Sequence, residues 1–390
     1  MEFNEGLLRK LAAMGDAYGV LSVYVTVDPR EDAPGAHVRV RNDLAAIRER
    51  ARNAMPRDQR MAVEARIEGL REPIEELLDA TESGLGRVLF ATVAGGESES
   101  FRLQVRMPDM AVLDEFAYVR PLVAATSETA PEGIVAVARG GVHLVDVRYG
   151  MAGDVYRSDF DVDTDDWRSK RGPASSRSGK GQSVVSHTDR FEDRVEANIA
   201  RLMRDAAPRV AETVRDRDWE RVTITGDPRL VDLIAGDLAQ RTGEDPVRAE
   251  LNVFGFPAQR MAEEMRPVLE ETRKRDDRAL AERVRDAARA GTTAATGLHD
   301  TLGGLNERRV ERLILDPERT WRGSRTPDGL LFPDGQVPPD VPEGDLTPVA
   351  DLGERMIERA LASDARVTAL DPDAAGILAD SDGIAAQLRW

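Results

Sequence analysis

The sequence between Trp167 and Arg190 combines basic residues, glycines and serines in a way that suits the binding of a polyanion. Its basic side chains all precede its first acidic residue, Asp189, in a chain whose formal net charge is -17. The basic side chains are those of Arg168, Lys170, Arg171, Arg177 and Lys180. A local excess of such side chains in an acidic protein predicts contact with a polyanion at this segment.

A helix is predicted directly after these residues. Ser186 and Asp189 have the spacing of a capping box. Apolar residues then recur at helical period, at Phe191, Val195, Ile199, Leu202, Met203 and Ala206. The free N–H groups and the positive dipole at a helix N-terminus favour phosphate. The segment therefore predicts a long basic loop that precedes an amphipathic helix and binds a polyanionic target.

Two other chemistries are disfavoured by the spacing of these residues. A nucleotide-binding P-loop has four residues between its first glycine and its Gly-Lys pair. Here residues 173–178 separate Gly172 from Gly179, and Gly181 stands where that motif has serine or threonine. A nucleophilic triad is not supported, because His187 is the one histidine near the serines and no nucleophile elbow surrounds a serine.

Composition limits the remaining possibilities. A chain of 390 residues, 41% of them hydrophobic, predicts a globular protein of several domains, and 54 Lys+Arg against 71 Asp+Glu disfavour nucleic-acid binding by the whole surface. Cysteine is absent and the histidines lack metal-ligand spacing, so we expect neither a metal nor a cofactor. No apolar run reaches the roughly 18 residues of a membrane helix, and the N-terminus is acidic, so we expect a cytoplasmic protein without membrane contact.

The predicted fold class is α/β, with three consecutive α/β domains at residues 1–130, 131–265 and 266–390. In the first domain, strands are expected at residues 20–27, 87–93, 100–106 and 118–125, with charged helices across residues 43–81. We expect the charged residues of these helices to lie on solvated faces. No catalytic constellation is evident in this domain.

The second domain is predicted to hold the basic loop. A hairpin of residues 133–139 and 142–148, turning at Gly140–Gly141, precedes a third strand at residues 154–160. After the loop and its helix, the pattern predicts a strand at 221–225, a helix at 228–241 and a strand at 247–253. A charged helix across residues 257–290, interrupted at Pro267, is expected to connect this domain to the third.

The third domain is predicted to be a small α/β/α sandwich. Helices are expected at residues 294–305 and 349–362, and strands at 310–315, 366–370 and 383–390. Residues 316–348 are rich in proline and glycine and long for a connection. We therefore expect them to form a partly ordered surface arm that contacts a protein partner.

The sequence Gly179-Lys180-Gly181-Gln182-Ser183 resembles the catalytic loop of the archaeo-eukaryotic class I release factors. In that family, Gly-Gly-Gln-Ser lies on a loop after a β-hairpin and before a helix with an Arg-Phe pair, here Arg190–Phe191. Residues 383–390, GIAAQLRW, resemble the closing strand of the third domain that the superfamily shares with Pelota. The order of three α/β units also agrees. Over residues 131–390 the chain thus resembles a bacterial, Vms-like member of this superfamily.

Three departures qualify what the resemblance implies. Lys180 occupies the place of the first glycine of the family's Gly-Gly-Gln, and extra residues lie between Gln182 and Arg190–Phe191. Residues 1–130 carry none of the family's stop-codon reading motifs. The resemblance therefore implies a release-factor-like protein that does not decode stop codons.

The chemistry implied by the resemblance is hydrolysis of the peptidyl-tRNA ester on stalled ribosomes or large subunits, with Gly181 and Gln182 as catalytic residues. Glycine at 181 lets the backbone approach the tRNA 3′ end without a Cβ clash. The N–H at Gln182 would orient water or stabilise the oxyanion. The RNA-binding residues would be Arg168, Lys170, Arg171, Arg177, Gly179, Lys180 and Arg190. The implied partners are the ribosome, through its rRNA and the peptidyl-tRNA 3′ end, and a translation factor at the C-terminal domain.

Two other functions stay open on the sequence. The first is a non-catalytic ribosome hibernation factor of the Balon type, from the same superfamily, which occupies the tRNA site without hydrolysis. The second is an acidic scaffold that never touches RNA, in which Gly-Lys-Gly-Gln is the ordinary composition of a linker.

Overall fold

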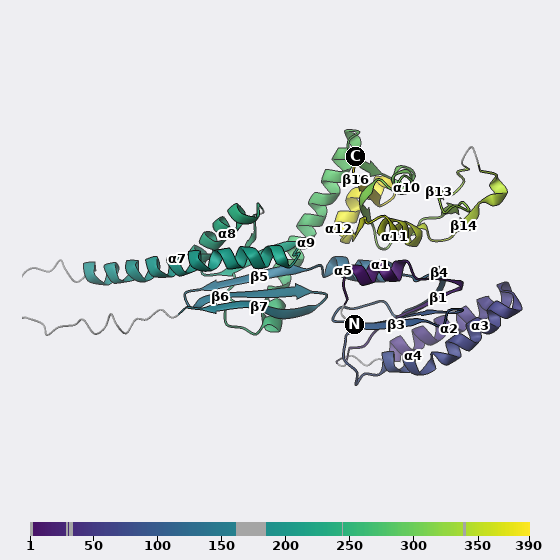
Figure 1. Cartoon of the computed structure of the whole chain (residues 1–390), viewed down its shortest axis with the longest axis horizontal. Coiled ribbons are helices and arrows are strands. Elements are labelled where there is room, and N and C mark those ends of the chain that lie inside the picture. The colour runs from purple at the N-terminus through teal and green to yellow at the C-terminus, as the bar shows by residue number, and fades with distance from the viewer. Residues whose placement is uncertain (1–2, 29, 31–33, 161–184, 244, 338–340) are drawn as a thin grey trace, which may run out of the picture. The chain divides into compact units, whose positions relative to one another are not determined.

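The computed structural model of this chain describes residues 3–28, 30, 34–160, 185–243, 245–337 and 341–390 (Figure 1). Contacts divide the chain into two compact units. Unit 1 combines Met1–Thr129 with Arg273–Trp390, and unit 2 is Ala130–Thr272. Sheets and helices occur in both units, so the predicted α/β class is confirmed. The division into three consecutive domains stays a prediction.

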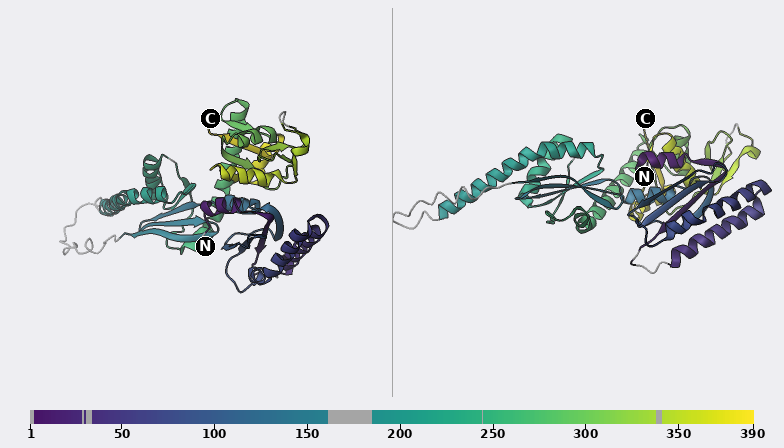
Figure 2. Two further views of the ribbon diagram at one scale, coloured as in Figure 1. Left: turned by 45° about the vertical axis from the view of Figure 1, so that its right-hand side comes forward. Right: turned by 60° about the horizontal axis from the view of Figure 1, so that its bottom comes forward.

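The N-terminal segment of unit 1 is built on an antiparallel sheet of order β3-β2-β1-β4. Its strands are β1 (Gly15–Thr26), β2 (Gly86–Thr92), β3 (Ser98–Leu103) and β4 (Met110–Phe116), and α1 (Glu5–Ala12) precedes them. Helices α2 (Pro34–Ala54), α3 (Arg57–Gly69) and α4 (Arg71–Leu78) cover one face of this sheet (Figure 2). Their apolar sides, including Val40, Ile47 and Ile67, form a core with Leu21 and Leu89 of the strands.

The strand predicted at residues 118–125 is wrong, because this stretch begins the helix α5 (Arg120–Glu128). Pro121 occupies the first turn, where its fixed φ suits a helix and its missing N–H costs no internal hydrogen bond. The β-branched and apolar residues around it gave the strand-like pattern. Tertiary contacts of α5, described below, override that local preference.

Unit 2 contains a five-stranded sheet of order β7-β6-β5-β8-β9. Its antiparallel half consists of β5 (Glu132–Ala138), β6 (Gly141–Arg148) and β7 (Met151–Asp159), while β8 (Arg221–Gly226) and β9 (Val247–Ala249) continue it in parallel. Helices α7 (Val185–Asp216) and α8 (Pro228–Thr242) pack on one face. The first half of α9 (Ala258–Arg289) packs on the other through Met261 and Met265. The predicted order of elements in this segment is confirmed.

The predicted hairpin is present, but its turn lies one residue earlier than expected. Ala138 pairs with Gly141, so Arg139 and Gly140 form the turn and Gly141 begins β6. Gly141 has a φ of 151°, and a Cβ there would lie 2.1 Å from the Ser158 carbonyl oxygen. The close approach of β7 therefore requires glycine at this position.

The C-terminal segment of unit 1 contains a sheet of order β10-β16-β11-β15. Its strands are β10 (Ala294–Thr296), β11 (Val310–Leu315), β15 (Arg366–Ala369) and β16 (Ile384–Leu388), and its helices are α10 (Leu298–Asn306), α11 (Leu352–Ala362) and α12 (Pro372–Ala375). The helix predicted at residues 294–305 is wrong in its first turn. Gly297, with a φ of 83°, separates β10 from α10.

Two other predictions in this part of the chain need correction. The α9 helix runs through Pro267 without interruption, because burial of Met265 and Leu269 on either side offsets the lost hydrogen bond. The segment expected to be a partly ordered surface arm forms, in its described residues, a second sheet from β12 (Gly323–Arg325), β13 (Leu331–Pro333) and β14 (Thr347–Val349), with Trp321 and Leu331 buried. Its contact with a protein partner stays a prediction.

Candidate functional site

The site predicted from the sequence lies in the connection between β7 and α7. The two predicted catalytic residues, Gly181 and Gln182, lie outside the described residues. The same holds for the predicted RNA-binding residues Arg168, Lys170, Arg171, Arg177, Gly179 and Lys180. Arg190 lies near the start of α7. The assignment of these residues stays a prediction, and the structure supplies the geometry of the two elements that the connection joins.

The first of these elements is the edge strand β7. Among the described strands it pairs with β6 alone, and immediately after it the Phe160 N–H donates to the Gly140 carbonyl over 2.7 Å. The Phe160 side chain packs against the core beneath α7. The chain therefore leaves the sheet beside the β5–β6 turn, from a point fixed by a backbone hydrogen bond.

The second element is the long helix α7, which begins at Val185 and so confirms the helix predicted after the basic segment. Ser186 lies inside its first turn. Among the described side chains of α7, Ile199 is the first that is buried. At 1.5 Å per residue, the helix covers about 20 Å between Val185 and Ile199. Figures 1 and 2 show these N-terminal turns extending beyond the sheet of unit 2.

The C-terminal half of α7 is tied firmly to the sheet. Met203 and Val210 are fully buried against it, and Met203 belongs to the apolar face that the sequence pattern predicted. Closer to the N-terminus of the helix, Nη1 of Arg229 on α8 donates to both carboxylate oxygens of Glu196, over 2.9 and 3.0 Å. The C-terminal half of α7 is thus anchored to the sheet, and its N-terminal turns project from it.

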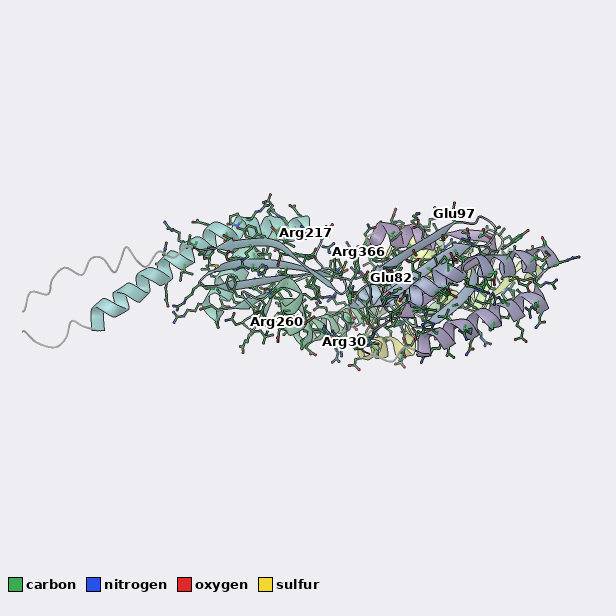
Figure 3. All side chains as sticks on the ribbon, turned by 90° about the horizontal axis from the view of Figure 1, so that it is seen from below. Arg30, Glu82, Glu97, Arg217, Arg260 and Arg366 are labelled. Carbon is green, nitrogen blue, oxygen red and sulfur yellow. The ribbon has the colours of Figure 1, made fainter. Side chains whose placement is uncertain are left out.

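Asp146 fixes the end of α7. Its carboxylate accepts a 2.8 Å hydrogen bond from Trp219 Nε1, a 3.0 Å bond from Arg148 Nε, and lies 3.5 Å from the Arg217 guanidinium. Arg217, labelled in Figure 3, directly follows α7. A Cβ on Gly133 would lie 2.2 Å from the Trp219 ring, so glycine there admits the indole. No local pattern in the sequence marks these positioning residues, although a glycine inside a strand signals such close approach.

Within the described part of the chain, no cluster offers unit 2 a metal site. His143 is 2% exposed and its Nε2 lies 2.7 Å from Asp154 Oδ1 across the β6–β7 pair. No three His, Asp or Glu side chains among these residues are placed to hold a metal ion. Nor does any described helix have the length and apolar character to cross a membrane.

Comparison with known proteins identifies the central segment. Residues 131–254 match the family model of bacterial archaeo-eukaryotic release factor family 5. The chain is also 20% identical to the uncharacterized protein YocB of Bacillus subtilis (strain 168) over 225 residues, which are 55% of this chain and 80% of that protein.

Similar solved structures include an archaeal translation termination factor, aRF1, with 15% identity over 99% of this chain and 96% of that one, and a TM-score of 0.23. Archaeoglobus fulgidus Pelota is 14% identical over 78% and 79% of the two chains, with a TM-score of 0.31. S. cerevisiae Dom34 is 9% identical over 78% and 80%, with a TM-score of 0.41. Whole-chain superposition is poor at such scores, so no residue role is taken from these structures. Residues 131–254 are thus similar to the bacterial archaeo-eukaryotic release factors, in agreement with the resemblance of the Gly179–Ser183 motif.

Proposed function

We propose that this protein binds the ribosome and hydrolyses the ester of peptidyl-tRNA on stalled ribosomes or large subunits, without reading stop codons. The observation that carries the proposal is the match of residues 131–254 to the bacterial archaeo-eukaryotic release factors, because the matched segment contains the Gly-Lys-Gly-Gln sequence. The proposal has two parts: a general one, association with the ribosome, and a specific one, hydrolysis of the ester.

The geometry of unit 2 supports the proposal. The motif precedes a helix whose N-terminal turns extend about 20 Å beyond Ile199, the first buried side chain among those of α7 that the structure describes. A narrow projecting element of this kind suits entry into a cavity walled by RNA. The basic residues near the motif would neutralise phosphates along that cavity, and the acidic remainder of the chain would disfavour other orientations.

The proposed chemistry relies on backbone geometry at Gly181 and Gln182. Residues 179–182 include no histidine or carboxylate, and Lys180, their one titrating side chain, occupies a position where the family has glycine, so we assign it no part in proton transfer. Water would attack the ester carbonyl, and an N–H group of the motif would stabilise the oxyanion, a contribution of about 10²–10³ in rate per donor. The neutral Gln182 side chain would exclude other nucleophiles. The proposed products are a free peptide and a deacylated tRNA.

The proposed partners are suggested by the descriptions of two matched structures. Two matched structures are described as a ribosome-bound archaeal Pelota with ABCE1 and as S. cerevisiae Dom34, a translation termination-like factor interacting with Hbs1. We propose the same classes of partner for this chain: the ribosome at unit 2, and a translation factor at the C-terminal segment of unit 1.

Hydrolysis of the ester is tested by release of labelled peptide from stalled 70S complexes and from free 50S complexes. Gly181→Ala should lower the release rate by about 10²-fold or more, because a Cβ obstructs the approach of the backbone to the ester. Gln182→Ala should slow release or admit other nucleophiles, and Lys180→Gly should keep or raise the rate. Gly172→Ala, in the same connection but outside the motif, is the matched control and should release peptide as the wild type does.

Lys180 occupies the place of the first glycine of the family's Gly-Gly-Gln, and this departure favours one alternative without catalysis. The alternative is a Balon-type hibernation factor, which would occupy the tRNA site without hydrolysis. That function predicts ribosome binding with no peptide release by the wild type, and no effect of any of these substitutions. Absence of release at saturating ribosome occupancy would contradict the hydrolase and leave ribosome binding intact. Absence of binding would instead favour the acidic scaffold.

A further inference from the structure

Within unit 1, the N-terminus of α5 is capped by a carboxylate from the C-terminal segment of the chain. Glu354 on α11 accepts hydrogen bonds from the N–H groups of Val119, at 2.6 Å, and Arg120, at 3.1 Å. Val119 is the N-cap residue of α5, and no side chain of that helix caps its own end. Glu354 is 1% exposed. One buried carboxylate therefore satisfies two N–H groups that the helix itself leaves unpaired.

The side chain of Arg120 joins the same two segments. It is 6% exposed, and its Nη1 donates to both carboxylate oxygens of Asp351 over 3.3 and 3.2 Å. Its Nη2 donates to the backbone carbonyls of Arg319 and Asp316. The guanidinium also lies 5.4 Å from the centre of the Trp321 ring. A buried arginine held by this many groups is costly to release unless all of them can be solvated together.

Further polar contacts surround this pair. Arg355 Nη2 donates to Asp114 over 2.7 Å, Arg325 Nη2 donates to Glu115 over 2.8 Å, and the Tyr118 hydroxyl donates to Asp351 over 3.3 Å. These contacts, with Glu354 and Arg120, connect residues 114–120 to residues 316–355. The interface between the two segments is thus rich in charged groups that must be dehydrated when it closes.

Burial is the largest influence on the Glu354 carboxyl, and it raises the pKa of this group to about 8. The two backbone N–H groups and Arg355 lower the pKa, and Asp351 raises it further. Burial also raises the pKa of Glu358, one helical turn further along α11. The other titratable and charged groups that surround Glu354 or the residues in contact with it are Tyr24, Asp114, Glu115, Tyr118, Arg120, Arg325, Asp351 and Arg355.

We propose that Glu354 and Arg120 form a latch that holds residues 1–129 on residues 273–390, and that loss of a proton to solvent favours its opening. In the open latch, Glu354 meets water and ionises at the ordinary pKa of a glutamate. In the closed latch, burial favours the protonated carboxyl. Between the ordinary pKa of a glutamate and the pKa of about 8 in the closed latch, the closed form therefore binds more protons than the open form. The stability of the closed form falls as pH rises through this range.

The test compares thermal unfolding of the full chain and of Glu354→Gln from pH 6 to pH 9. Glutamine has nearly the same shape but cannot ionise. The Tm of the wild type should fall by about 2–5 °C more than that of Glu354→Gln over this range. Glu311→Gln, at an exposed position on β11, is the matched control and should follow the wild type. Equal pH dependence of wild type and Glu354→Gln would overturn the proposal.

Hydrogen exchange of the wild type tests the latch without a variant that perturbs folding. After correction for the intrinsic pH dependence of exchange, protection of the Val119 and Arg120 amides should decrease several-fold between pH 6 and pH 9. The amides of α8 in unit 2, which lie far from the latch in the sequence, should keep their protection. Constant protection at Val119 and Arg120 across this range would contradict proton-linked opening.

Discussion

Two long connections in this protein have similar compositions and different structural roles. Residues 161–184 join β7 to α7, and residues 316–351 join β11 to α11. Both are rich in glycine, proline or serine, and the sequence predicted irregular structure for both. In the second connection, however, Trp321 and Leu331 are 4% and 2% exposed, and three short strands form a sheet. The first has Val162, Trp167 and Val184 as its large apolar residues, against five basic ones.

Anchoring by distant groups, rather than length or glycine content, accounts for the folding of the second connection. Trp321 Nε1 donates to the Asp382 carbonyl over 2.7 Å. Asn306 forms a pair of hydrogen bonds with the Leu331 backbone, donating to its carbonyl over 2.8 Å and accepting from its N–H over 3.0 Å. Arg359 holds the Gly329 carbonyl at 2.8 Å. Each anchor comes from an element outside the connection, so it is not visible in the local sequence.

The largest effect on stability is expected from Trp321→Ala. The substitution leaves a cavity beside Arg120 and removes the hydrogen bond to Asp382, and we expect a loss of about 3–5 kcal/mol in the free energy of unfolding of unit 1. Urea denaturation measures it. Trp390→Ala, at an indole that is 64% exposed, is the control and should change little. A loss below about 1 kcal/mol for Trp321→Ala would show that the connection is not part of the core.

A smaller loss is expected from Asn306→Ala. It leaves the N–H and the carbonyl of Leu331 without their partner, each a cost of about 1–3 kcal/mol if water does not replace it. Asn306→Asp keeps the acceptor for the N–H and loses the donor, so its loss should lie between those of the wild type and the alanine variant. Denaturation of all three proteins gives the order. Equal stability of the three would mean that the β13 strand is held by other contacts.

Much of the fold follows from the sequence where a pattern is local. The hairpin of β5 and β6, the helix α7 and the strand β8 each have a complete signal within their own residues. Prediction failed where a distant group decides the structure. Helix α5 looks like a strand until the Glu354 cap and the contacts of Arg120 are known, and α9 continues through Pro267 because residues on both sides are buried.

The candidate site likewise has features that a local pattern predicts and features that depend on distant residues. The spacing of Gly179–Ser183 and the basic residues suffice to predict a polyanion-binding segment and its family, and the family match agrees with that prediction. The helix that positions the segment was also predictable. The groups that fix this helix were not, because Asp146, Trp219 and Gly133 come together through the sheet. No local pattern links these three positions.

The smallest effect on stability is expected in the first connection. Simultaneous replacement of Arg168, Lys170 and Arg171 by glutamate should leave the free energy of unfolding within about 0.5 kcal/mol of the wild-type value, as for surface substitutions that break no buried contact. Thermal unfolding of the two proteins provides the comparison. A larger loss would show that these side chains contribute to the folded unit, as Trp321 does in the second connection.

Ribosome binding by these same two proteins tests the central claim most directly. The wild type should sediment with 70S ribosomes at low salt and less at higher salt, because its basic side chains displace counterions from RNA phosphates. The triple glutamate variant should remain in the supernatant at every salt concentration, although it is folded. Failure of the wild type to sediment with ribosomes at any salt concentration, or equal sedimentation of the two proteins, would contradict the assignment of residues 168–171 as a ribosome-binding segment.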